Sequence, residues 1–248
     1  MSLDFLRPDW PAPATVRAAV TTRTGGVSGG PYAGFNLASH VGDAPEAVAA
    51  NRARLRAALG LPREPAWLRQ VHGTAIVDAA RAAPDAEADA SFATAPGHCC
   101  AVLTADCLPI LFCDAAGTRV AAVHGGWRGL AADIVATAVA ALATAPAGLL
   151  AWIGPGIGPR AYAVGPELRA AFCDRDPGCA AAFRQDGTQW YADLAAIARR
   201  QLGALGVGWI GGAGHCTFEA ADRYYSYRRE PVTGRMASLV WLVSADTR

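Results

Sequence analysis

Apolar and polar positions alternate along the chain in two different periods, and these periods predict its strands and helices. Short apolar and β-branched runs predict strands at 16–23, 66–79 (interrupted by a short break), 98–107, 108–124 and 235–244, and a strand that runs into a Gly/Pro loop at 149–159. Apolar residues at helical spacing predict helices at 43–60, 130–144 and 193–206. The strands come in groups with helices between the groups, which favours a mixed α/β or α+β sheet protein over a regular βαβ array.

The ends of two helices are marked by local sequence signals. Asp43 is placed to cap the helix at 43–60, Pro45 suits its first turn, and Gly60 ends it. The helix at 193–206 begins at Asp193 and ends at Gly206.

The residues from Ile134 to Ile153 contain no charge over twenty positions, which is long enough for a membrane span. Pro146 and Gly148 interrupt this stretch, so we expect a buried helix, a turn and a strand instead. With no low-complexity linker or repeat along the chain, we expect a single domain over residues 1–248.

Composition narrows the functional classes. The chain is 52% hydrophobic and 17% charged, as expected of a folded globule, and its net charge of +1 gives no footprint for nucleic acid. It contains no Lys, which excludes a Schiff-base or Walker-A lysine. The seven Cys form no C-x-x-C, and "MSLDFLRPDW" lacks signal-peptide architecture, so we expect reduced thiols in a cytoplasmic protein.

A thiol and an imidazole face each other in the predicted hairpin. If Asp114 and Gly117 close its turn, Cys107 lies directly opposite His124, with Cβ atoms about 4.5–5.5 Å apart. This arrangement suits a Cys-His nucleophile pair or two metal ligands, and equally a core Cys that opposes a hydrogen-bonded His. The pattern alone leaves these alternatives open.

Three further residues could join this pair. His72 lies at a strand break and would complete a Cys-His-His set that leaves a fourth zinc position free, although a structural His is the alternative. Asp106 could orient a ligand His or act as an acid or base, but strand alternation points it away from Cys107. Arg128 precedes a predicted helix and could hold phosphate or pair with a surface acid.

Six long motifs occur in order between about residues 16 and 243 and together resemble the YfiH-like proteins. These motifs are "TTRTGGVSGGPYAGFNLASHVGD", "WLRQVHG", "TADCLPILF", "VHGGWRGL", "WIGPGIGP" and "YSYRREPVTGRMASLVWL". The family is also known as laccase-domain or multicopper polyphenol oxidase-type purine nucleoside phosphorylases.

The resemblance implies a fold and a site. It implies a single-domain, layered α-β-β-α fold similar to the catalytic domain of cytotoxic necrotizing factor toxins. It also implies a zinc ion held by His72, Cys107 and His124, which are then catalytic as well. We further expect substrate or phosphate contacts from Arg23, Asn36, Gln70 and Arg128. In one departure, Gly125 stands where the family usually has Ala, which adds backbone freedom without removing a ligand.

The activities attributed to the family give four hypotheses. The leading one is a zinc-dependent purine nucleoside phosphorylase acting on adenosine, inosine or methylthioadenosine, with adenosine deaminase activity. The alternatives are a Cys-His amidase that edits peptidoglycan precursors, a copper-dependent polyphenol oxidase, and a non-enzymatic zinc protein. Five His are too few to ligate several copper ions, which disfavours the oxidase. We expect a small-molecule substrate, no nucleic acid or membrane partner, and a monomer.

Overall fold

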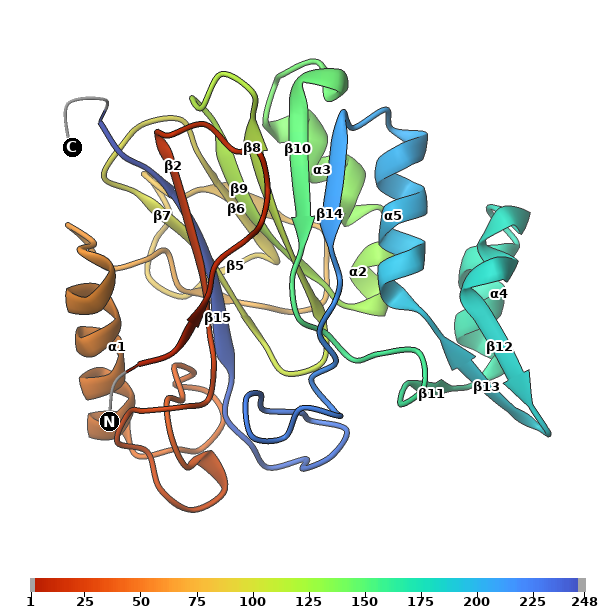
Figure 1. Cartoon of the computed structure of the whole chain (residues 1–248), viewed down its shortest axis with the longest axis horizontal. Helices are drawn as coiled ribbons and strands as arrows, with labels where there is room; N and C mark the ends of the chain where they lie inside the picture. Colours follow the sequence, from red (N-terminus) through yellow and green to blue (C-terminus); the bar gives the residue numbers. More distant parts are fainter. Residues whose placement is uncertain (1–2, 245–248) are drawn as a thin grey trace.

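Two β-sheets stacked face to face form the centre of the molecule (Figure 1). The computed structural model describes residues 3–244. The four-stranded sheet is ordered β1 (Phe5–Leu6), β2 (Val16–Thr21), β15 (Met236–Leu242) and β7 (Cys99–Thr104). The six-stranded sheet is ordered β14 (Trp209–Gly212), β10 (Leu149–Ile153), β8 (Leu108–Asp114), β9 (Val120–Gly125), β6 (Ala90–Ala93) and β4 (Ile76–Asp78).

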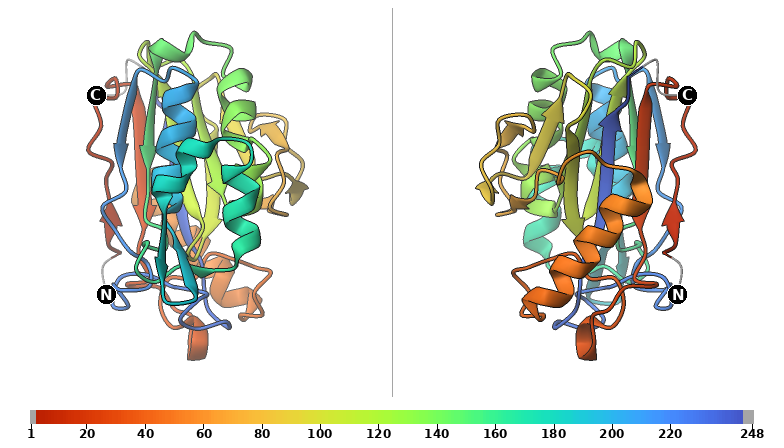
Figure 2. Two further views of the ribbon diagram at one scale, coloured as in Figure 1. Left: turned by 90° about the vertical axis from the view of Figure 1, so that its right-hand side faces the viewer. Right: turned by 90° about the vertical axis from the view of Figure 1, so that its left-hand side faces the viewer.

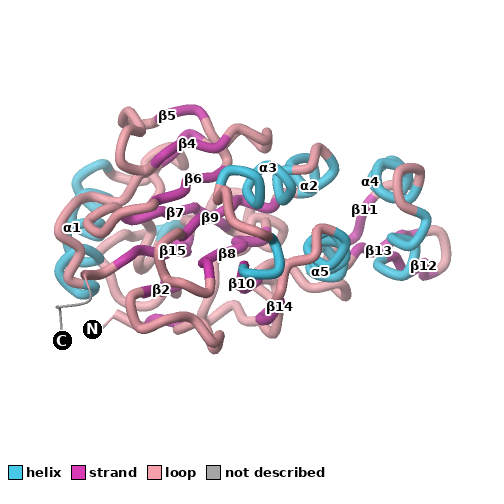
Figure 3. Tube along the Cα trace, turned by 90° about the horizontal axis from the view of Figure 1, so that it is seen from above, coloured by secondary structure: helices cyan, strands magenta, loops and turns pink. Residues whose placement is uncertain are grey.

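Helices cover the outer faces of both sheets, which gives four layers when the molecule is seen from above (Figure 3). Helix α1 (Pro45–Leu59) lies on the four-stranded sheet, and its Leu55 is buried against that sheet's outer face. The other sheet is covered by α2 (Trp127–Ala131), α3 (Ile134–Ala141) and α5 (Leu194–Ala204). Figure 2 shows the two outer faces in turn, with α4 (Pro166–Cys173) in front of α5 in one view and α1 in front in the other.

Apolar side chains fill the space between the sheets and both spaces under the helices. Between the sheets, Val102 of β7 and Val240 of β15 pack with Leu111 of β8 and Trp152 of β10. Every residue of β8 and β9 is buried, because one face of this hairpin meets the other sheet and the opposite face meets α3. Strands buried on both faces read as continuous apolar runs, as these two do.

A smaller unit projects beside α5 (Figure 1), and the apolar pattern of the sequence does not predict it. It consists of β11 (Ala163–Val164), α4 (Pro166–Cys173), β12 (Phe183–Asp186) and β13 (Gln189–Ala192). A two-stranded sheet joins β3 (Leu68–Arg69) to β5 (Ala86–Glu87). Within the described residues, 3₁₀ turns lie at Gly30–Tyr32, Pro146–Gly148 and Pro177–Ala182.

The predicted helices are present, with two corrections. Helix α1 ends at Gly60, whose φ of 62° is left-handed, but Asp43 does not cap it and instead accepts hydrogen bonds from Ser28 and Asn36. The helix expected at 130–144 is broken between α2 and α3 by Asp133, which has a φ of 68°. Helix α5 is capped as predicted, since Asp193 accepts a hydrogen bond of 2.9 Å from the amide of Ala196.

The predicted hairpin register is wrong by two residues. Asp114 pairs with Arg119, because its carboxylate accepts hydrogen bonds from the amides of Thr118 and Arg119 and so lengthens the loop. The residue opposite His124 is therefore Pro109, and Cys107 lies in the loop before β8. Cys107 and His124 are therefore not cross-strand partners.

The mixed α/β class predicted from the pattern is confirmed, and helices on both outer faces give the layered arrangement. The likeness to the toxin catalytic domain stays a prediction. So does the single domain over residues 1–248, of which 1–2 and 245–248 lie outside the described residues. The stretch from Ile134 to Ile153 forms α3, a turn and β10, and no helix within residues 3–244 is long and apolar enough to cross a membrane.

Candidate metal centre

His72, Cys107 and His124 converge at one end of the six-stranded sheet. His124 belongs to β9, Cys107 lies in the loop between β7 and β8, and His72 lies in the loop between β3 and β4. Their ligand atoms all lie within 4.8 Å of one another, and Sγ of Cys107 is 3.9 Å from Nε2 of His72. The two loops therefore bring His72 and Cys107 to His124, although Cys107 and His124 are not paired across the strands.

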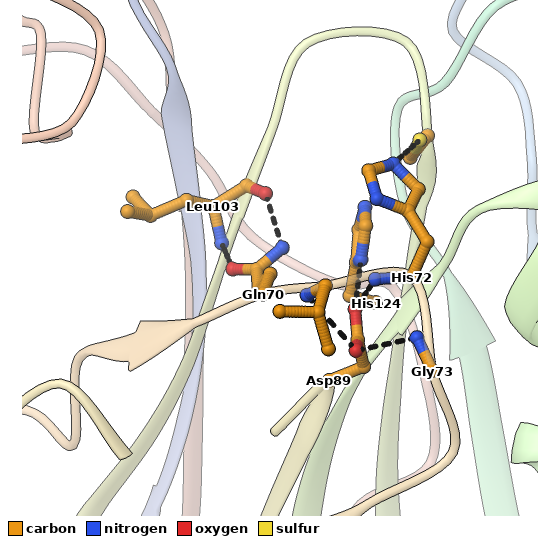
Figure 4. A network of polar contacts seen from close by, with 8 residues as sticks. Gln70, His72, Gly73, Asp89, Leu103 and His124 are labelled. Carbon is orange, nitrogen blue, oxygen red and sulfur yellow. Dashed lines mark hydrogen bonds and ion pairs between the residues drawn. The ribbon is translucent and has the colours of Figure 1, made fainter. Parts of the chain in front are cut away.

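The orientation of His124 is fixed by Asp89, which immediately precedes β6 (Figure 4). Nδ1 of His124 lies 2.7 Å from Oδ1 of Asp89, and both side chains are at least 96% buried. With Nδ1 held by the carboxylate, Nε2 is the ring nitrogen left free for a metal or for Cys107.

The loop that carries His72 is bound to the same carboxylate. The amides of Val71, His72 and Gly73 donate to Asp89 at 3.1, 2.9 and 2.7 Å. His72 has a φ of 61°, a left-handed conformation that is unfavourable for a residue with a side chain. The three hydrogen bonds to Asp89 offset that cost and hold the imidazole toward Cys107.

Gln70 fastens the start of this loop to β7. Its Nε2 donates to the carbonyl of Leu103 at 2.9 Å, and its Oε1 accepts from the amide of Leu103 at 2.7 Å (Figure 4). Both polar groups of the Gln70 side chain are thus engaged by the protein's own backbone.

Gly126 makes room for the three side chains. A Cβ at this position would lie 2.8 Å from Cδ2 of His72, 3.2 Å from Sγ of Cys107 and 3.6 Å from Cε1 of His124. The first of these distances is shorter than real Cβ contacts. Only glycine at position 126 therefore allows the backbone to approach these three side chains so closely.

The three side chains shift one another's ionisation. Burial opposes ionisation of the Cys107 thiol, but the adjacent imidazoles of His124 and His72 outweigh it and lower the pKa of Cys107 to about 6. Burial also opposes protonation of His124, but the Cys107 thiolate and the Asp89 carboxylate raise the pKa of His124 to about 9. Burial would raise the pKa of Asp89, yet its hydrogen bonds from His124 and Gly73 hold it below its usual value.

This donor set fits a zinc ion. One thiolate and two imidazoles are ligands that zinc prefers, and tetrahedral bond lengths place such donors about 3.3–3.6 Å apart. The 3.9 Å separation of Sγ and Nε2 is close to that spacing. Three protein ligands leave a fourth position for water or substrate, which is the pattern of catalytic rather than structural zinc sites.

The centre opens into a cavity of about 430 Å³ that is rich in cationic and aromatic groups. Arg128, Arg228 and Arg235 line it, and within residues 3–244 none of the three forms an ion pair with an acid. Trp127, Tyr162 and Tyr227 also line it. Unpaired guanidinium groups beside aromatic faces suit a ligand with both an anionic and an aromatic part.

The expected substrate residues divide into two groups. Gln70 and Arg128 line the cavity, whereas Arg23 and Asn36 are not among its lining residues. Arg23 donates to the carbonyl of Ala221 and stacks 4.8 Å from the ring of Tyr225.

Asn36 and Asp106 hold the backbone of two cavity arginines, Arg235 and Arg228, by hydrogen bonds. Asn36 is fully buried and accepts a hydrogen bond of 2.9 Å from the amide of Arg235. The Asp106 carboxylate accepts from Thr217 at 2.6 Å and from the amide of Arg228 at 2.7 Å, so it contacts neither ligand His.

Sequence reasoning missed several residues of this site. The only sequence signal for Asp89 is an acid placed directly before a buried strand in "AEADASFA". Arg235, Tyr162 and Tyr227 reach the cavity from distant loops, and His40 lines it as well. No local spacing relates these residues to His72 or Cys107.

The fold and the site together define a two-sheet α/β protein with one Cys-His-His group suited to a metal. Residues 17–243 match the family described as multi-copper polyphenol oxidoreductase laccase. The chain belongs to this family.

Relatives and a solved structure are similar to this chain over almost its whole length. The chain is 51% identical over 240 residues to "Purine nucleoside phosphorylase PA4543" of Pseudomonas aeruginosa, covering 96% of this chain and 98% of that protein. It is 49% identical over 237 residues to "Purine nucleoside phosphorylase YfiH" of Shigella flexneri, covering 95% and 98%. The crystal structure of Neisseria meningitidis protein NMB0706 is similar with a TM-score of 0.94 at 48% identity, covering 97% of this chain and 99% of that one.

Proposed function

We propose that the protein is a zinc-dependent purine nucleoside phosphorylase that also deaminates adenosine. The observation that carries the proposal is the cavity itself. Three arginines that form no ion pair within residues 3–244 line it together with a Cys-His-His group. The names of its relatives support the phosphorylase activity. Phosphorolysis converts a nucleoside and phosphate into the free base and ribose 1-phosphate, so the site must hold one anion and one aromatic base together.

The arginines are suited to the anion. Guanidinium groups bind phosphate oxygens through paired N–H donors, and we assign this role to Arg128, Arg228 and Arg235. Phosphate held beside C1′ of the ribose would attack that carbon as the bond to the purine breaks. Holding both reactants in one cavity removes much of the entropic barrier to their encounter.

The aromatic side chains are suited to the base. Trp127, Tyr162 and Tyr227 offer faces on which a purine can stack, and Tyr227 is 55% exposed at the surface. His72, Cys107 and His124 would hold the zinc ion, which when bound supplies Lewis acidity at its open fourth position.

A second candidate function is Cys-His hydrolysis, as in the amidase hypothesis. The observation that favours it is the chain of contacts from Asp89 through His124 to Cys107, because an acid that orients a base beside a thiol is the arrangement of cysteine hydrolases. The two functions compete for one thiolate, since a sulfur bound to zinc is less free to attack a substrate.

Parallel assays separate these functions. Inosine and adenosine are incubated with and without phosphate, an acyl-peptide amidase assay is run beside them, and zinc is measured in the same protein sample. The proposal predicts base release that requires phosphate, together with about one zinc per chain. Phosphate-independent amide cleavage by metal-free protein would instead establish the hydrolase. The expected cytoplasmic location and monomeric state stay predictions.

A further inference from the structure

We propose that Asp89 is the positioning residue of the metal centre and that its single carboxylate sets the orientation of both histidine ligands before a metal binds. The inference rests on the Cys-His-His centre of the proposed function, but it does not depend on which reaction that centre catalyses.

The division of donors between the two carboxylate oxygens carries the inference. Oδ1 lies 2.9 Å from the amide of His72 and 2.7 Å from Nδ1 of His124. Oδ2 accepts from the amides of Val71 and Gly73 at 3.1 and 2.7 Å. Each oxygen therefore accepts two N–H groups, and the carboxylate as a whole connects His124 on β9 to the loop of His72 (Figure 4).

The backbone of Asp89 is held independently of its side chain. Its carbonyl accepts from the amide of His124 at 2.8 Å, and its amide donates to the carbonyl of Ala75 at 3.0 Å. These bonds continue the strand pairing of β6 with β9 and β4. Changing only the side-chain atoms should therefore leave the sheet intact and alter the orientation of the histidines.

Asp89→Asn tests this role because an amide has one acceptor oxygen where the carboxylate has two. If the NH₂ group takes the place of Oδ1, it faces Nδ1 of His124, which must then lose its proton. The proton moves to Nε2, and that nitrogen can no longer bind a metal. If the NH₂ group takes the place of Oδ2, the amides of Val71 and Gly73 lose their acceptor and the loop of His72 is released.

Asp114→Asn is the matched control. Asp114 is 4% exposed, and its carboxylate accepts three hydrogen bonds, from the amide and hydroxyl of Thr118 and from the amide of Arg119. It lies at the other end of the β8–β9 hairpin from the metal centre. A general loss of stability should affect both variants, whereas only Asp89→Asn should change the histidines.

Two measurements are made on both variants and on the unmodified protein. Zinc affinity is determined by competition with a chromophoric chelator. The nitrogen of His124 that keeps a proton is identified at pH 10, above the raised pKa of about 9 of this imidazole, in metal-free, ¹⁵N-histidine-labelled protein. Long-range ¹H–¹⁵N correlations report it, and His124→Gln assigns the signals.

We expect Asp89→Asn to bind zinc about 10–100-fold more weakly and Asp114→Asn to bind it with unchanged affinity. In the unmodified protein we expect a proton on Nδ1 of His124. Unchanged zinc affinity in Asp89→Asn with the proton still on Nδ1 would overturn the inference. If that variant does not fold, the unmodified protein decides the question, because an unprotonated Nδ1 in it contradicts the role of Asp89.

Discussion

Gly126 and His72 are so close that a Cβ on Gly126 would lie 2.8 Å from Cδ2 of the imidazole. The backbone at the start of α2 thus forms one wall of the metal centre, and it lies against Cys107 as well as His72. This contact leads to a prediction that concerns the metal and not the stability of the fold as a whole.

Gly126→Ala should displace His72 or Cys107 and weaken zinc binding by about 10-fold or more, because ligand positions must hold within a few tenths of an ångström. Isothermal titration of metal-free protein with zinc measures the change. Gly203→Ala in α5 is the control, since a Cβ there meets nothing within 4 Å. It should leave zinc affinity unchanged and raise stability by about 0.4–1 kcal/mol. Equal zinc affinity in both variants would contradict the packing argument.

The ionisation of Cys107 gives a prediction about pH. The thiolate is the form that reacts with iodoacetamide, and its fraction grows as the pH rises through the pKa. In metal-free protein the pKa of Cys107 is lowered to about 6 despite its burial, so alkylation should reach half its maximal rate near that pH. His124→Gln removes the cationic neighbour and should move the midpoint up toward about 8.5.

Mass spectrometry of the alkylated peptides identifies which thiol has reacted. Cys100 and Cys113 serve as internal controls, because burial raises the pKa of each to about 12 and they should stay unlabelled over the same range. A midpoint for Cys107 that does not move in His124→Gln would show that the imidazole does not set its ionisation.

Arg128 gives a prediction about phosphate. Its side chain is exposed at the cavity, stacks 4.6 Å from the ring of Trp127 and forms no ion pair within residues 3–244. Arg128→Gln should raise the KM for phosphate about 10-fold and change the KM for inosine much less, because a charge-assisted hydrogen bond contributes about 1.5–3 kcal/mol. Steady-state kinetics with each substrate varied in turn provides both values.

The control for Arg128→Gln is Arg54→Gln, an exposed change on α1 at the opposite face of the molecule. It should leave both KM values unchanged. A phosphate KM that is unaffected in Arg128→Gln would remove this residue from the anion site and leave Arg228 and Arg235 as its members.

The buried strands and the three side chains of the candidate metal centre could be predicted from the sequence, but the contacts that orient these side chains could not. Continuous apolar runs made β8, β9 and β10 visible because both faces of these strands are covered. The break at Asp133 could not be seen, since the apolar pattern continues through it and only its left-handed backbone separates α2 from α3.

The residues of the candidate metal centre could not be predicted from local sequence patterns, because they are far apart along the chain. His72, Cys107 and His124 came from motifs that resemble a known family, whereas the strand-pairing argument for Cys107 and His124 failed by two residues. That error arose because hydrogen bonds from the amide and hydroxyl of Thr118 to the Asp114 carboxylate lengthen the turn. Asp89 escaped notice because its partners lie 16–18 and 35 residues away and follow from tertiary structure alone.

The proposed phosphorylase activity requires one zinc ion on His72, Cys107 and His124. The most direct measurement is a titration of metal-free protein with zinc during continuous detection of hypoxanthine released from inosine in phosphate. We predict no release without metal, then a linear rise that ends at one zinc per chain, and no rise for Cys107→Ala. Full release by metal-free protein, or no release at any zinc ratio, would contradict the account.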